Sequence, residues 1–150
     1  MSFQSIGLLI HSLSRQWRSL LDQQLAPLGF TQCSGVALVY IAEHQGLSQT
    51  ELARLLGIET PSLVPVLDQL EKQGLVKRQP SESDRRQKVL TLLPDALPLV
   101  AQINERRQAL QQLMLDGLPA DQQQLFPLMV QQLVQQSSLL LEQQKSGTQS

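Results

Sequence analysis

The residues with the clearest chemical potential are cations gathered near the middle of the chain. Between Lys72 and Lys88 there are six basic and two acidic residues, so this segment carries +4 in a protein whose net charge is −1. Guanidinium and ammonium groups gathered in this way bind phosphate groups. The sequence therefore predicts a local surface for a polyanion such as nucleic acid, formed by Lys72, Lys77, Arg78, Arg85, Arg86 and Lys88.

The remaining residues offer little for covalent or metal chemistry. No serine or cysteine has a recognisable general base, so we expect no enzyme activity. His11 and His44 lie far apart and have no second ligand at metal spacing, so neither a metal site nor a cofactor is expected. The single cysteine, Cys33, is interpreted as a small buried hydrophobic residue, with a redox-sensing thiol as the alternative. A lone cysteine and the lack of a run of ~20 apolar residues indicate a soluble, cytoplasmic protein.

Two short helices near the basic segment have clear sequence signals at their ends. Residues 48–51, SQTE, form a capping box, and Gly57 supplies a left-handed stop. Thr60 is the expected N-cap of the next helix, which has Pro61 at its first position and ends near Gly74. Two short helices joined by a glycine-containing turn predict a helix-turn-helix, although plain helical hairpins share this pattern.

A β-hairpin and long helices complete the expected fold. Strands at 75–79 and 88–92, joined by the charged loop 80–87, would add a wing to the helix-turn-helix. The fold class is mainly α with a small β-wing: a winged helix-turn-helix over 31–93, flanked by helical dimerisation regions at 1–30 and 94–145. Broad apolar stripes on the flanking helices favour a two-fold homodimer. We expect Pro127 to kink or divide the last helix, and residues 146–150 to be disordered.

The helix that starts at residue 60 is the expected reading helix, because one of its sides is apolar and the other is polar. At 100° per residue, Leu63, Leu67 and Leu70 fall on the buried side. Pro65 falls on the outward side, and its missing amide would have bonded to the carbonyl of Pro61. The outward positions chosen as DNA contacts are Pro61, Ser62, Pro65, Gln69 and Lys72.

Further DNA contacts are expected on either side of this helix. Gln49 and Thr50 begin the preceding helix, where free amides suit a phosphate, with plain first-turn capping as the alternative. Arg78 on the first strand is a candidate phosphate contact. The loop cations Arg85, Arg86 and Lys88 are chosen as contacts, the alternative being a solvated hairpin tip.

Four stretches of the chain resemble the MarR family of transcriptional regulators, specifically its SlyA-like branch. They are QWRSLLDQQLAPLGFTQ at 16–32, GLSQTELARLLGIETPSLV at 46–64, LDQLEKQGLVKRQ at 67–79 and SDRR at 83–86. The resemblance implies an obligate homodimer that binds palindromic operator DNA and is released by small phenolic or aromatic carboxylate ligands. It also implies that Arg86 enters the minor groove and that Asp84 orients it through an ion pair. Pro65 departs from close relatives, which have a base-reading arginine there, and Leu93-Pro94 replaces the usual threonine cap.

The most ligand-suggestive group is Trp17 with Arg15 and Arg18 beside it, since an aromatic ring and a guanidinium could hold an aromatic carboxylate. The alternative places Trp17 in the core and the arginines in solvent or paired across a dimer. The leading interpretation is thus a homodimeric, ligand-responsive DNA-binding repressor or activator. Its rival, suggested by Pro65 and the low overall charge, is a MarR-fold sensor or interaction module with weak or no sequence-specific DNA binding.

Overall fold

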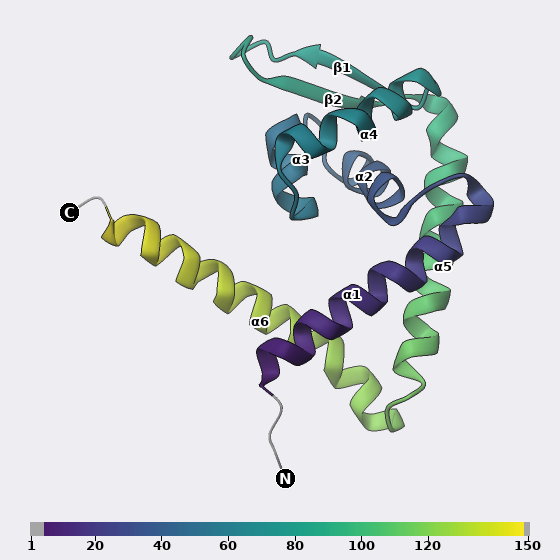
Figure 1. Cartoon of the computed structure of the whole chain (residues 1–150), viewed down its shortest axis with the longest axis vertical. Helices are drawn as coiled ribbons and strands as arrows, with labels where there is room; N and C mark the ends of the chain where they lie inside the picture. Colours follow the sequence, from purple (N-terminus) through teal and green to yellow (C-terminus); the bar gives the residue numbers. More distant parts are fainter. Residues whose placement is uncertain (1–4, 149–150) are drawn as a thin grey trace. The chain divides into compact units, whose positions relative to one another are not determined.

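The computed structural model describes residues 5–148, which are mainly helical with one two-stranded sheet (Figure 1). The chain divides into two compact units, residues 1–110 and 111–150, which we describe separately. The elements are α1 (Ile6–Leu25), η1 (Ala26–Leu28), α2 (Gln32–Glu43), α3 (Gln49–Leu56), α4 (Thr60–Lys72), β1 (Val76–Pro80), β2 (Lys88–Leu92), η2 (Pro94–Ala96), α5 (Leu97–Leu115) and α6 (Ala120–Gly147).

Local side-chain chemistry fixes the ends of the short helices in the first unit. The Thr31 hydroxyl accepts from the Ser34 amide and the Ser34 hydroxyl accepts from the Thr31 amide, so the capping box lies at α2. At α3 the Ser48 hydroxyl accepts from the Glu51 amide at 3.1 Å, as predicted, whereas the reciprocal bond from Glu51 is not among the hydrogen bonds of the described residues. Gly57, with φ 69°, ends α3 in the left-handed conformation.

The start of α4 differs by one residue from the prediction. Glu59 occupies the N-cap position with extended backbone, and no side chain caps the helix. Thr60 is the first helical residue instead of the cap. Pro61 lies in the first turn, where a missing amide costs little.

The sheet is an antiparallel hairpin with Val76 opposite Leu92 and Pro80 opposite Lys88. The outer edge of β2 also bonds to the residues just before α3. Ser48 forms an isolated bridge with Val89, and the Leu90 amide donates to the Leu47 carbonyl at 2.9 Å. The start of α3 is therefore attached to the wing.

The core of the first unit is built from leucines of every helix around α2. Leu21, Leu25, Leu38, Leu52, Leu63, Leu67 and Leu70 are fully buried, as are Leu90 of β2 and Ile103 of α5. Gly35 lets α1 approach α2 closely, since a Cβ there would lie 2.6 Å from the Leu25 Cδ1. The buried stripe predicted for α4 is thus confirmed, with Val66 half-buried beside it.

In the second unit, α6 is one helix that continues through Pro127. Of the two predicted effects of Pro127, division of the helix is therefore wrong, whereas a kink is not contradicted, since Figure 1 shows α6 bent along its length. The helix extends to Gly147, so residues 146 and 147, expected to be disordered, are helical, while 149–150 lie outside the described residues. No residue of α6 is buried, although it carries many large apolar side chains.

No single helix within residues 5–148 is long and apolar enough to cross a membrane. Ile6–Leu28 together with Gln32–Glu43, bent by 82°, pass the length and hydropathy criteria only as a pair.

Candidate nucleic-acid interface

The outward side of α4 is a row of exposed side chains. Pro61, Ser62, Pro65, Gln69 and Lys72 are all exposed, whereas Leu63, Leu67 and Leu70 are fully buried. The helix continues through Pro65 without a break. The spacing of 100° per residue therefore assigned Pro65 correctly to the exposed side of α4. This proline changes the exposed surface of the helix without disturbing its packing.

The loop between β1 and β2 is held by short-range hydrogen bonds. The Ser81 amide donates to the Gln87 carbonyl at 2.9 Å, and the Gln87 amide donates to the Asp84 carbonyl at 3.0 Å. Arg85, Arg86 and Lys88 are exposed around this turn. Figure 1 shows the hairpin extending past α3 and α4, so these cations are carried beyond the body of the first unit.

Asp84 has a different partner from the one predicted. Its Oδ1 accepts from the backbone amide of Arg86 at 3.0 Å, and neither ion pair found in residues 5–148 involves it. The carboxylate thus closes a tight turn in the main chain, a common use of aspartate. This contact shapes the loop and leaves the Arg86 guanidinium without the ion pair that the sequence suggested.

Arg78 makes both of the ion pairs found in the described part of the chain. Its Nε donates to Glu71 Oε2 at 2.6 Å and its Nη2 donates to Asp68 Oδ1. Burial alone would lower the pKa of Arg78, but hydrogen bonds and charges from Asp68 and Glu71 outweigh it and raise the pKa above its usual value. The guanidinium therefore ties β1 to the outer side of α4.

Asp68 and Glu71 were not chosen from the sequence. The available signal was their position, because at 100° per residue Asp68 also falls on the outward side of α4, near the strand that begins after Gly74. A phosphate contact by Arg78 remains a prediction, and a phosphate would have to compete with these two carboxylates.

The remaining chosen residues lie on α1 and α3. Gln49 is half-buried and Thr50 is exposed at the first turn of α3. Trp17 is half-buried and packs against the core, while Arg15 and Arg18 are exposed, with Arg18 Nε donating to the Ser14 carbonyl at 3.4 Å.

Cys33 lies half-buried at the start of α2. Burial, and secondarily the negative charge of Asp22, raises the pKa of its thiol. A raised pKa lowers the thiolate fraction and with it the reactivity. Within residues 5–148, no group of three or more His, Cys, Asp or Glu side chains could hold a metal ion.

A helix-turn-helix followed directly by a two-stranded wing defines the winged helix-turn-helix class. The family model described as "MarR family" matches residues 30–88, which include α2, α3, α4 and β1. The transcriptional regulator PA3341 is 34% identical over 88% of this chain and 97% of its own, with a TM-score of 0.75. The chain belongs to the MarR family.

Two further solved structures share the fold. The apo form of wild-type MarR from E. coli is 25% identical over 88% of this chain and 98% of its own, with a TM-score of 0.79. MepR from S. aureus, crystallised as a DNA complex, is 24% identical over 91% of this chain and 99% of its own, with a TM-score of 0.74.

Proposed function

We propose that this protein is a homodimeric transcriptional regulator that binds palindromic operator DNA. Family membership supports this proposal, and so does the DNA complex of MepR, which shares the fold. The observation that carries it is the exposed side of α4 next to the hairpin, where the segment from Lys72 at the end of α4 to Lys88 in β2 carries a local charge of +4. In winged-helix proteins of this kind, the second helix enters the major groove.

The proposal gives the chosen residues distinct tasks. Ser62, Pro65 and Gln69 face the base edges from α4, where the glutamine amide can read adenine and the proline ring can touch a thymine methyl. Gln49 and Thr50 contact a phosphate at the start of α3. Arg86 enters the minor groove, whose negative potential attracts a guanidinium. Backbone phosphates are met by Lys72, Arg78, Arg85 and Lys88, with Pro61 against the sugar-phosphate backbone and Asp84 holding the loop.

The apolar surface of the terminal helices supports a homodimer. Ile6 is 72% exposed and Ile10 56%, and on α6 Leu133 is 59% exposed and Leu141 61%. On each of these helices, the exposure of so many large apolar residues marks an interaction surface. A second copy of the chain would cover this surface and present two reading helices to successive major grooves.

Finer assignments rest on the resemblance and, for the ligand site, on the residue types of Arg15, Trp17 and Arg18. They place the chain in the SlyA-like branch and make it responsive to a small aromatic or phenolic ligand held by Arg15, Trp17 and Arg18. Such a ligand would shift the population between two spacings of the reading helices and so lower operator affinity. A regulator of this type works on DNA in the cytoplasm.

A mobility-shift assay on DNA from the chain's own promoter region, at two salt concentrations, tests the central proposal. We expect a shift that survives excess unrelated DNA, weakens steeply with salt, and is reduced by Arg86→Ala. The matched control is Arg106→Ala, which removes an exposed arginine of α5. Light scattering should give twice the chain mass of 16.7 kDa. Loss of the shift under competition would favour a sensor or interaction module.

A further inference from the structure

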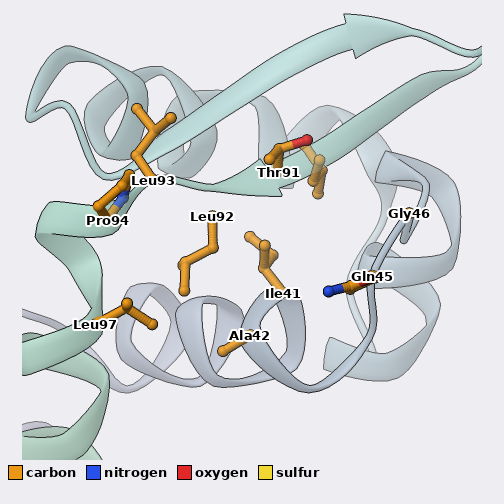
Figure 2. Close-up of a pocket in the computed structure, with 10 residues that line it drawn as sticks. Ile41, Ala42, Gln45, Gly46, Thr91, Leu92, Leu93, Pro94 and Leu97 are labelled. Atoms are coloured by element: carbon orange, nitrogen blue, oxygen red, sulfur yellow. The ribbon is translucent and has the colours of Figure 1, made fainter.

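A cleft of about 480 Å³ lies between the end of α2, β2 and the start of α5 (Figure 2). Its size falls within the range of small-molecule sites. Figure 2 shows Ile41 and Ala42 on one side and Leu92 on the other, with Gln45 pointing between them and Leu97 at the edge. None of these residues was chosen from the sequence, because they come from three separated segments.

The cleft contains no charged side chain. Its remaining lining residues are Gly46, Leu90, Thr91, Leu93 and Pro94. The Arg15, Trp17 and Arg18 group does not contribute to this lining. A carboxylate bound here would lose its hydration without meeting a cation, which is unfavourable. The lining therefore selects for an uncharged ligand.

Strand β2 offers unpaired backbone groups beside the cleft. The Leu93 amide donates to the Leu75 carbonyl, so Val76 and Leu92 are a non-hydrogen-bonded pair and the Leu92 amide and carbonyl point away from β1. The same alternation sends the Leu90 amide outward, where it donates to Leu47. Leu47 follows Gly46, so Leu92 lies on the edge that faces the α2–α3 connection, and no hydrogen bond of the described residues uses its outward groups.

We propose that this cleft binds a neutral, mostly apolar small molecule that carries a carboxamide or an equivalent donor–acceptor group. The apolar body packs on Ile41, Ala42 and Leu97. The polar group exchanges hydrogen bonds with the outward amide and carbonyl of Leu92 and with the Gln45 side chain. This site is distinct from the one proposed for an aromatic carboxylate. The chain binds the ligand here in the absence of DNA, so this binding activity is additional to the proposed operator binding.

A pair of probes with the same shape and different charge tests the proposal: 2-naphthamide and 2-naphthoate. Each is titrated into the full-length, isotope-labelled chain and followed by NMR. We expect 2-naphthamide to shift the signals of Ile41, Gln45, Leu92 and Leu97. We expect 2-naphthoate to bind this cleft at least about tenfold more weakly, because its charge is left without a partner.

Two variants fill the cleft from different sides. Leu97→Trp enlarges a side chain that is 59% exposed, and Ala42→Phe enlarges a half-buried one. The matched control is Ala26→Phe, which adds the same bulk at an exposed position of η1. Both filling variants should abolish the 2-naphthamide shifts while the control keeps them, and thermal melting shows which variants remain folded. No shifts at these residues, shifts that survive in a folded filling variant, or equal binding of 2-naphthoate would overturn the proposal.

Discussion

Pro65 is the position where one substitution can separate base reading from helix stability. Pro65→Arg makes two changes at once: it restores an amide that can donate to the Pro61 carbonyl, and it adds a guanidinium to the exposed side of α4. Pro65→Ala restores only the amide. Comparing the two variants with the unchanged chain therefore isolates the effect of the guanidinium.

The two effects have different expected sizes. A proline in a helix interior costs about 3 kcal/mol relative to alanine. Its stiffening of the unfolded chain offsets roughly 0.4–1 kcal/mol of this. Because Pro65 lies early in α4, we expect Pro65→Ala to raise the free energy of unfolding by about 2 kcal/mol. A bidentate arginine–guanine contact adds about 1–3 kcal/mol of discrimination, or roughly 5- to 150-fold at one base pair, in Pro65→Arg alone.

Urea unfolding at one fixed protein concentration measures the first effect, since the apparent stability of a dimer depends on concentration. Selection from a randomised DNA library, followed by titration of single-base variants at one salt concentration, measures the second. A role for position 65 in base reading is contradicted if Pro65→Ala changes base preference as much as Pro65→Arg, or if Pro65→Arg gains no preference. The expected gain in stability is refuted if Pro65→Ala lowers the stability of the chain.

Substitutions at Arg86 and Gly35 and alkylation of Cys33 test three other features of the chain. Arg86→Ala should lower the salt slope of DNA binding by about one unit, as measured by titration at several salt concentrations, and an unchanged slope would mean that Arg86 neutralises no phosphate. Gly35→Ala should lower the free energy of unfolding by about 1–3 kcal/mol in urea, because its Cβ meets the Leu25 side chain, and an unchanged value would show that Leu25 moves aside freely. Alkylation of Cys33 should be slower at neutral pH than that of a cysteine in an unfolded peptide, and should accelerate only at higher pH, because its raised pKa keeps the thiol protonated longer. Equal rates across the pH range would contradict this.

Short-range features of the fold were readable from the sequence because they depend on neighbouring residues. Ser48 and Gly57 set the ends of α3 through contacts within one turn. The apolar spacing of Leu63, Leu67 and Leu70 determined which side of α4 is buried, and hence where Pro65 lies.

Features that depend on competition between partners were harder to predict. Arg78 has the type and charge of a phosphate contact, yet it forms ion pairs with Asp68 and Glu71 across the junction of α4 and β1. Asp84 could pair with an arginine side chain or with a backbone amide, and the tight turn favours the amide. Pro127 lies inside α6 without dividing it, so a count of helix-breaking residues overestimates the number of helix ends. The cleft requires three segments to meet, and spacing along one segment cannot reveal this.

Ser48 performs two structural tasks at once, with a consequence for how the protein folds. Its hydroxyl caps α3, and its backbone forms the bridge to Val89, near the end of β2 that adjoins the loop of the wing. The start of α3 and the hairpin are thereby joined by contacts that close a long loop of the chain. Closing that long loop costs chain entropy before the contacts are gained, which slows folding. We therefore expect the amide of Leu90, bonded to Leu47, to exchange with solvent only when α3 also opens.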